Sequence, residues 1–181
     1  PIKALQLLLS LAGEYRPVDT IVIGTSMGAM YASQMKGYRR ILVNPAFHVS
    51  DLLKENKGKR LQFFSEREDG CDYFDVSESL IHEFEEMETN LFNVNDATPK
   101  SVIGLFGDKD ELCNCLDEYR NNYFYWSIFE GGHRLTENVI MDTLLPLINW
   151  FRNPDYTFER ICLPFEEVRP GDTGYIGEMD N

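Results

Sequence analysis

Short apolar runs alternate with helical patterns along this chain, and this alternation limits its fold more than any other feature. The apolar runs are residues 19–23, 40–43, 101–106 and 123–129. The helical patterns between and after them are residues 27–36, about 77–91, about 111–120 and about 136–151. Short apolar runs of this kind are typical of strands that are buried on both faces. The repeat predicts an α/β fold: a mostly parallel sheet with helices on both faces.

The sequence predicts one domain with an irregular insertion and a carboxy-terminal extension. At 181 residues and 43% hydrophobic content, the chain has the size of a single domain with a proper core. Residues 2–14 predict an amphipathic helix ahead of the first strand. Residues 47–99 are irregular and charged, and predict a helical cap inserted between strands. We therefore assign residues 1–151 to the domain and residues 152–181 to the extension, with a mobile tail from Arg169.

Charge and cysteine usage exclude several classes of function. The formal net charge is −13, and no segment gathers Lys and Arg into a face that neutralises phosphates, so nucleic acid is not an expected partner. No apolar run approaches the roughly 20 residues that cross a bilayer, so we expect no membrane span. The cysteines form no CxxC pair, and Cys113 and Cys115 are too close together to suggest a disulfide framework or a zinc site. We expect free thiols, a cytoplasmic location, and neither metal nor cofactor.

The segment Gly24-Thr25-Ser26-Met27-Gly28 stands directly after the first apolar run and directly before a helix. This is the context that a G-x-S-x-G nucleophile elbow requires. We expect both glycines of this elbow to avoid clashes as strand and helix approach. The turn would direct Ser26 outward at the carboxyl ends of the strands, where ligands bind in such folds. The dinucleotide-binding pattern G-x-G-x-x-G is absent.

Gly131-Gly132-His133 follows the last apolar run and places a histidine on a loop at the same edge of the sheet as Ser26. The other two histidines fit a catalytic role less well. His82 belongs to the Glu-rich helix of the insertion, and His48 follows the second strand with no partner in view. We therefore predict that His133 is the base that acts on Ser26.

Gly107-Asp108-Lys109-Asp110 follows the third apolar run and offers two carboxylates at this edge. A carboxylate here can accept the second N–H of the histidine and stabilise the imidazolium that forms during acyl transfer. We assign this role to Asp110, while Asp108 is the competing candidate and would otherwise shape the turn. The chain order Ser, Asp, His at successive strand ends is the order used with the G-x-S-x-G elbow.

At these residues the sequence resembles the α/β-hydrolase superfamily, and within it the small YqiA-like bacterial esterases. The resemblance covers about residues 18–150 and is weak across the insertion. The matching segments are Gly24 to Gly28 with Tyr31-Ala32, Ile41 to Ala46, Gly107 to Leu112, and Glu130 to His133. This resemblance implies a sheet of α/β-hydrolase type and an esterase or thioesterase that acts on short acyl substrates without a metal.

The chain departs from this family at its beginning. Family members carry more chain before the elbow, including the first strands and a His-Gly loop that supplies an oxyanion-hole N–H. Only 23 residues precede Gly24, so we expect that loop to be missing, and the start at Pro1 looks like a truncation or a processing boundary. The N–H of Met27 would supply one oxyanion donor. The elbow strand should lie near an exposed edge unless a partner or an edge strand from residues 156–165 covers it.

The predicted reaction is two-step acyl transfer on a small acyl ester or thioester. His133 takes the proton of Ser26, Ser26 attacks the carbonyl, and water then releases the acyl group while Asp110 orients His133. Two alternatives stay open: a non-catalytic module of this fold that binds a ligand or a protein, and an acyltransferase that uses the same serine. Assembly into a homo-oligomer is also left open.

Aromatic residues of the insertion have two interpretations of equal weight. They shape the pocket for the acyl group, or they only pack the cap on the core. The residues concerned are Phe63, Phe64, Tyr73, Phe74, Phe84 and Phe92.

Overall fold

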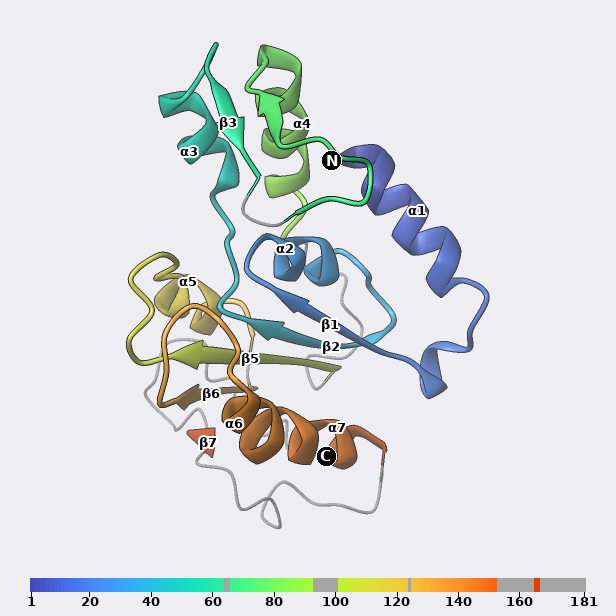
Figure 1. Cartoon of the computed structure of the whole chain (residues 1–181). Helices are drawn as coiled ribbons and strands as arrows, with labels where there is room; N and C mark the ends of the chain where they lie inside the picture. The colour runs from blue at the N-terminus through green and yellow to red at the C-terminus, as the bar shows by residue number, and fades with distance from the viewer. Residues whose placement is uncertain (64–65, 93–100, 124, 153–164, 167–181) are drawn as a thin grey trace.

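One mostly parallel sheet lies at the centre of the molecule (Figure 1). The computed structural model describes residues 1–63, 66–92, 101–123, 125–152 and 165–166. Within this part of the chain the strand order is β1-β2-β5-β6-β7. The strands are β1 Ile21–Thr25, β2 Arg39–Val43, β5 Val102–Gly107, β6 Tyr125–Phe129 and β7 Phe165–Glu166. β1, β2, β5 and β6 are parallel and β7 is antiparallel to β6, which confirms the predicted mostly parallel α/β sheet.

The register of the four parallel strands aligns their carboxyl ends. Thr25 at the end of β1 pairs with Val43 at the end of β2, and Gly107 at the end of β5 pairs with Phe129 at the end of β6. The loops that follow these strands therefore leave the sheet along a single edge. This edge receives the segments that begin with Ser26, with Asn44, with Asp108 and with Glu130.

Helices cover both faces of the sheet, as predicted. α2 (Met27–Ser33) and α5 (Leu116–Arg120) lie on one face, where Met30 and Tyr119 join the core. α6 (Glu137–Val139), a π-helical turn (Ile140–Leu144) and α7 (Leu145–Arg152) form a nearly continuous helix on the other face (Figure 1).

Strand β2 shows why its sequence is a continuous apolar run. Ile41 and Val43 pack into the core with α7, whereas Leu42, between them, packs into the core with α2. All three side chains are fully buried. Because successive side chains point to opposite faces, a strand covered on both sides needs an apolar residue at every position.

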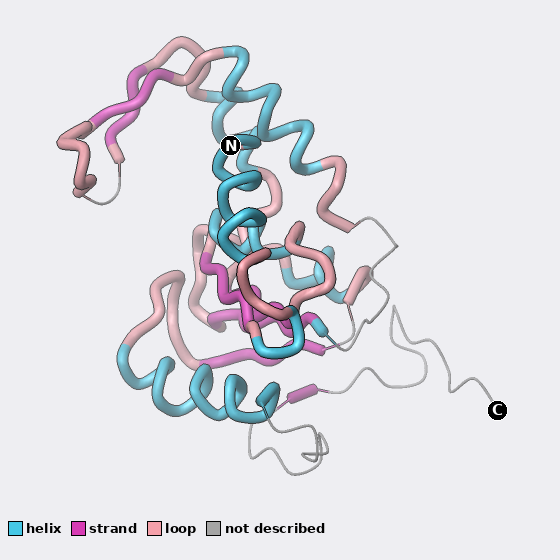
Figure 2. Tube along the Cα trace, turned by 90° about the vertical axis from the view of Figure 1, so that its right-hand side faces the viewer, coloured by secondary structure: helices cyan, strands magenta, loops and turns pink. Residues whose placement is uncertain are grey.

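The described residues of the insertion form two helices and a two-stranded antiparallel ribbon. Its elements are α3 Val49–Glu55, β3 Arg60–Gln62, β4 Tyr73–Asp75 and α4 Glu78–Glu88. Ser77 caps α4, because its side chain accepts a hydrogen bond from the Leu80 N–H at 3.1 Å. Glu88, at the end of α4, accepts hydrogen bonds from the N–H and the hydroxyl of Ser50 at 2.7 and 2.5 Å. The ribbon projects from these helices, away from the sheet (Figure 2).

The aromatic residues of the insertion pack in two places. Phe84 is buried in the core that also contains α2, and Phe92 packs edge-on against Phe47 with ring centroids 5.0 Å apart. Phe63 and Phe74 stack on each other in the ribbon at 4.9 Å. Packing therefore accounts for these four residues, while their role in an acyl pocket stays a prediction. Tyr73, which is half exposed, lies beneath Arg60 in the ribbon, and Phe64 lies outside the described residues.

Two predicted helices are shorter than expected. The helix expected over residues 111–120 begins only at Leu116. Ahead of it, the Asp110 carboxylate accepts hydrogen bonds from the N–H groups of Leu112 and Cys113, and this local turn is not continued as a helix. The helix expected over residues 27–36 ends at Ser33.

The amino-terminal side of the sheet is only partly covered within the described part of the chain. β1 is the first strand of the order, and Ile23 on it is 40% exposed, in agreement with the expected exposed edge. α1 (Ile2–Ala12) has no buried residue, although Ile2 and Leu5 contact the core. β7 pairs with β6 at the opposite end of the sheet.

No helix in the described part of the chain is both long enough and apolar enough to cross a membrane. The edge strand expected over 156–165 falls almost wholly outside the described residues, of which β7 takes in only Phe165 and Glu166. The tail expected from Arg169 also lies outside them.

Candidate active site

Ser26 lies at the turn between β1 and α2 in a strained backbone conformation. Its φ is 53° and its ψ is −123°, a combination that costs a non-glycine residue about 1–3 kcal/mol. Two hydrogen bonds stabilise it, one to the last residue of β2 and one from the loop that follows. The Ser26 N–H donates to the Val43 carbonyl at 2.9 Å, and the Ala46 N–H donates to the Ser26 carbonyl at 3.1 Å. The rest of the fold therefore maintains the strain at this one serine.

The two glycines of the elbow differ in their surroundings. A Cβ on Gly24 would lie 2.3 Å from the Gly28 carbonyl oxygen and 2.7 Å from the Ala29 Cα, so β1 and α2 approach too closely for any side chain. A Cβ on Gly28 would meet nothing within 4 Å. The expected clash is confirmed at Gly24 and wrong at Gly28, because the Gly28 backbone is the surface that Gly24 packs against.

His133 and Asp110 form a direct pair at the carboxyl edge of the sheet. The His133 Nδ1 lies 2.9 Å from the Asp110 Oδ2, and the two side chains are 19% and 3% exposed. The other Asp110 oxygen accepts hydrogen bonds from Leu112 N–H at 2.8 Å and Cys113 N–H at 3.2 Å. Because the carboxylate only accepts, Nδ1 carries the proton, and Nε2 is left as the basic nitrogen.

Asp108, the competing candidate, has a different partner. Its carboxylate accepts a hydrogen bond from the Gly131 N–H at 2.8 Å, and the residue is exposed. The Lys109 N–H donates to the Gly131 carbonyl at 2.9 Å, and a Cβ on Gly107 would lie 2.5 Å from that same oxygen. Asp108 therefore joins the loops after β5 and β6, and Asp110 is the aspartate that contacts His133.

Asn44 is a site residue that lies in the matching segment Ile41 to Ala46, although the sequence alone assigned it no role. It has a positive φ of 44° and is 1% exposed. Its side-chain amide donates to the carbonyls of Gly132 and His133 at 3.1 and 2.9 Å, and its oxygen accepts from the Gly107 N–H at 2.7 Å. The sequence feature that could have indicated this role is a polar residue directly after the buried strand β2.

Cys113 is the second residue that the sequence reasoning missed. It is half-buried, and its thiol and the Ser26 hydroxyl interact through a side-chain hydrogen bond. Burial, together with the negative charge of Asp110, raises the pKa of the Cys113 thiol to about 11, although the bond with Ser26 opposes this rise. The thiol is therefore protonated at neutral pH and is a poor nucleophile beside Ser26. Its position three residues after Asp110 is the sequence feature that could have indicated a place in the site.

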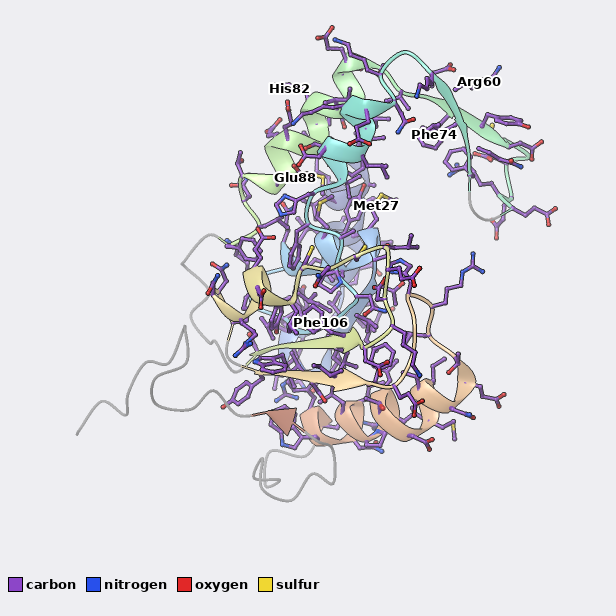
Figure 3. The ribbon with its side chains drawn as sticks, turned by 90° about the vertical axis from the view of Figure 1, so that its left-hand side faces the viewer. Met27, Arg60, Phe74, His82, Glu88 and Phe106 are labelled. Carbon is purple, nitrogen blue, oxygen red and sulfur yellow. The ribbon has the colours of Figure 1, made fainter. Side chains whose placement is uncertain are left out.

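Met27 follows Ser26 as the first residue of α2. Its N–H belongs to the first turn of the helix, where backbone N–H groups have no intrahelical acceptor. The side chain is 45% exposed, and Figure 3 shows Met27 between Phe106 of the sheet and Glu88 of the insertion. The Met27 N–H therefore has no acceptor within α2, as an oxyanion donor requires.

The other two histidines pair with glutamates elsewhere. His48 Nε2 lies 2.6 Å from Glu118, and His82 Nδ1 lies 3.6 Å from Glu85. Figure 3 shows His82 on the helix of the insertion, far from the sheet. These contacts agree with the choice of His133 among the three histidines.

A scan of protein-family models finds none that matches this chain, and a search of curated proteins finds no match either. Ser26, Asp110 and His133 follow three of the four aligned strand ends. A buried carboxylate paired with a histidine, at the same edge of the sheet as a strained serine, is a set of groups that can perform nucleophilic acyl transfer.

Proposed function

We propose that this chain is a serine hydrolase of α/β-hydrolase type that cleaves carboxylic esters or thioesters, similar to the YqiA-like esterases. The observation that carries the proposal is the strained Ser26 at the sheet edge that also holds the His133–Asp110 pair. Strain of this kind is typical of a nucleophile elbow, in which a sharp turn exposes the serine hydroxyl. Nothing in the proposal requires a cofactor, and a cytoplasmic location is part of it.

The acylation step begins with proton transfer from Ser26 to Nε2 of His133. The Ser26 oxygen then forms a bond to the substrate carbonyl carbon, and the carbonyl π electrons move to its oxygen. The Met27 N–H donates a hydrogen bond to this oxyanion, a contact worth on the order of 10²- to 10³-fold in rate. Collapse expels the alcohol or thiol, which takes the proton from His133, and Asp110 stabilises the imidazolium in between.

Deacylation repeats these roles with water. His133 takes a proton from water, the hydroxide oxygen attacks the acyl carbon, and Ser26 leaves with the proton returned. In the free chain the Ser26 hydroxyl interacts with the Cys113 thiol, so the hydroxyl has to turn from Cys113 toward His133 before reaction. The acid product is released and the starting protonation states are restored.

Labelling with a fluorophosphonate probe on the full chain tests the proposal. We expect the probe to modify Ser26, identified by peptide mass mapping, and expect S26A to remain unlabelled. D110N should be labelled far more slowly than the wild type. If folded wild-type protein is not labelled, the chain is a non-catalytic binding module and the proposal is wrong.

Acyl release to water and to added alcohols separates the hydrolase from an acyltransferase. A hydrolase releases free acid as its main product, and added alcohol increases ester formation only in proportion to its concentration. Ester as the main product at low alcohol concentration would instead identify an acyltransferase that uses the same serine.

A further inference from the structure

Asp110, Cys113 and His133 form a cluster of three different metal-binding side chains. A carboxylate oxygen, the cysteine sulfur and an imidazole nitrogen all lie within 4.8 Å of one another. Asp110 and Cys113 come from the loop after β5, and His133 comes from the loop after β6. The cluster is thus spatial, since His133 is distant from the other two in the sequence.

We propose that this cluster binds a thiophilic divalent cation, Zn²⁺ or Cd²⁺, and that the bound cation reversibly blocks Ser26. The proposal goes beyond hydrolase activity, because cation binding requires only the three side chains. Its effect on Ser26 rests on the proposed function.

The donor set selects the class of cation. Thiolate and imidazole ligands favour zinc and its soft relatives, whereas Mg²⁺ and Ca²⁺ require mainly oxygen ligands in larger numbers. Ligand atoms of a tetrahedral zinc site at about 2.0–2.3 Å from the metal lie roughly 3–4 Å apart, so the cluster needs only small side-chain shifts. Three protein ligands leave a fourth position for an exchangeable ligand.

The surroundings favour a site that is partly preformed and reversible. Asp110 is already oriented by the N–H groups of Leu112 and Cys113, and the side chains of Asp110 and His133 are mostly buried. Binding requires Cys113 to release its thiol proton to solvent as the sulfur–metal bond forms. A site with three ligands and a protonated thiol should bind more weakly than a closed structural zinc site.

Cation binding would remove the groups that act on Ser26. His133 bound to a metal cannot accept the Ser26 proton, and Asp110 bound to a metal no longer orients His133. Cys113, whose thiol interacts with the Ser26 hydroxyl in the free chain, becomes a metal ligand. Fluorophosphonate labelling of Ser26 should therefore slow at saturating Zn²⁺ and recover fully when a chelator is added.

Cadmium titration of the full chain, followed by thiolate-to-cadmium absorbance in the ultraviolet, tests the site directly. We expect one cadmium per chain with a thiolate signal, and a loss of affinity of at least about tenfold in C113S. Cys115 lies on the same loop, is also half-buried and is not part of the cluster, so C115S is the matched control and should bind as the wild type does. Equal cadmium binding by C113S and wild type would overturn the proposal.

Two further variants make the result independent of folding and of hydrolysis. D110N, checked for native circular dichroism, should also weaken cadmium binding at least about tenfold, and an unchanged affinity would overturn the site if C113S fails to fold. S26A should bind cadmium as the wild type does even if the chain proves not to be a hydrolase. Failure of the metal site and failure of the proposed function are therefore distinguishable.

Discussion

Two aspartates two residues apart perform different tasks at this site. Asp110 is buried against His133, and Asp108 accepts one hydrogen bond from Gly131 at the surface. The sequence could narrow the acid to these two, because both follow the same strand, but it could not separate them. The separation depends on which oxygen faces the loop of His133, and that contact joins residues 23 positions apart.

Substitution of each aspartate by asparagine tests this division. D110N should lower kcat for ester hydrolysis by about 10⁴-fold, because an amide can donate to Nδ1 and thereby favour the wrong histidine tautomer. D108N keeps an acceptor for the Gly131 N–H and should lower kcat by less than about tenfold. Steady-state kinetics on both variants measure the difference. Comparable losses in the two variants would contradict the assignment.

Asn44 is predicted to position His133 without contacting substrate. N44A removes three hydrogen bonds from a buried residue and should lower the free energy of unfolding by about 2–4 kcal/mol. Its kcat should fall by about 10²-fold with little change in KM, since a shift of the His133 loop misaligns the base. Urea unfolding and steady-state kinetics provide both readouts.

N44G serves as the control for backbone strain at Asn44. Glycine accepts the positive φ but lacks the amide, so N44G should restore about 1 kcal/mol of stability relative to N44A without restoring kcat. Full recovery of kcat in N44G would show that the backbone, and not the side chain, positions His133.

At the scale of elements, the crossing of β1 and α2 is the tightest contact near the site. The close approach of β1 and α2 could be predicted from the sequence, since a small residue is needed where a strand turns directly into a helix. The sequence could not show that only Gly24 is needed for it, because this depends on which backbone atoms face each other. The early start expected for α5 was wrong because a helical pattern does not show where the loop that carries Asp110 to His133 ends and the helix begins.

Alanine substitutions at the two glycines form a matched pair. G24A should destabilise the fold by several kcal/mol or prevent folding, because its Cβ would overlap the backbone of Gly28 and Ala29. G28A should retain the fold and have similar or greater stability, because its Cβ meets nothing and alanine favours the helix by up to about 1 kcal/mol. Thermal unfolding compares the two. Equal destabilisation would contradict the described crossing.

At the scale of the whole molecule, the sequence was sufficient to predict the sheet but not how the helix α1 packs against the rest of the domain. Parallel order and aligned strand ends follow from the alternation of apolar runs and helices. The exposure of Leu7 and Leu11 on α1, at 60% and 50%, was not expected from an amphipathic pattern, because the pattern does not say what packs against a helix. Cys113 and Asn44 were missed because their roles arise only where separate loops meet.

The half-buried thiol of Cys113 and the buried hydroxyl of Tyr119 predict a loss of stability at alkaline pH. Burial raises the pKa of the Cys113 thiol from 9.0 to about 11. Burial also raises the pKa of the Tyr119 hydroxyl well above its ordinary value of 10.0. In the unfolded chain these groups lose their protons at lower pH. Between about pH 9 and pH 11 the unfolded state therefore binds fewer protons than the folded state, and the free energy of unfolding falls as pH rises.

Urea unfolding across this pH range measures the effect. Stability should be nearly constant from neutral pH to about pH 8 and then decline, and C113S should show a shallower decline because serine does not ionise there. A decline of the same slope in C113S would show that the buried thiol does not contribute.

The central claim is that Ser26 forms a covalent acyl intermediate with His133 as its base. Rapid mixing of the full chain with p-nitrophenyl acetate, followed by intact-mass analysis and peptide mapping, tests it most directly. The account predicts a burst of p-nitrophenol stoichiometric with protein and an acetyl group on Ser26, and predicts neither in S26A or H133A. Absence of the burst in folded wild-type protein, or an acetyl group on Cys113 with none on Ser26, would contradict it.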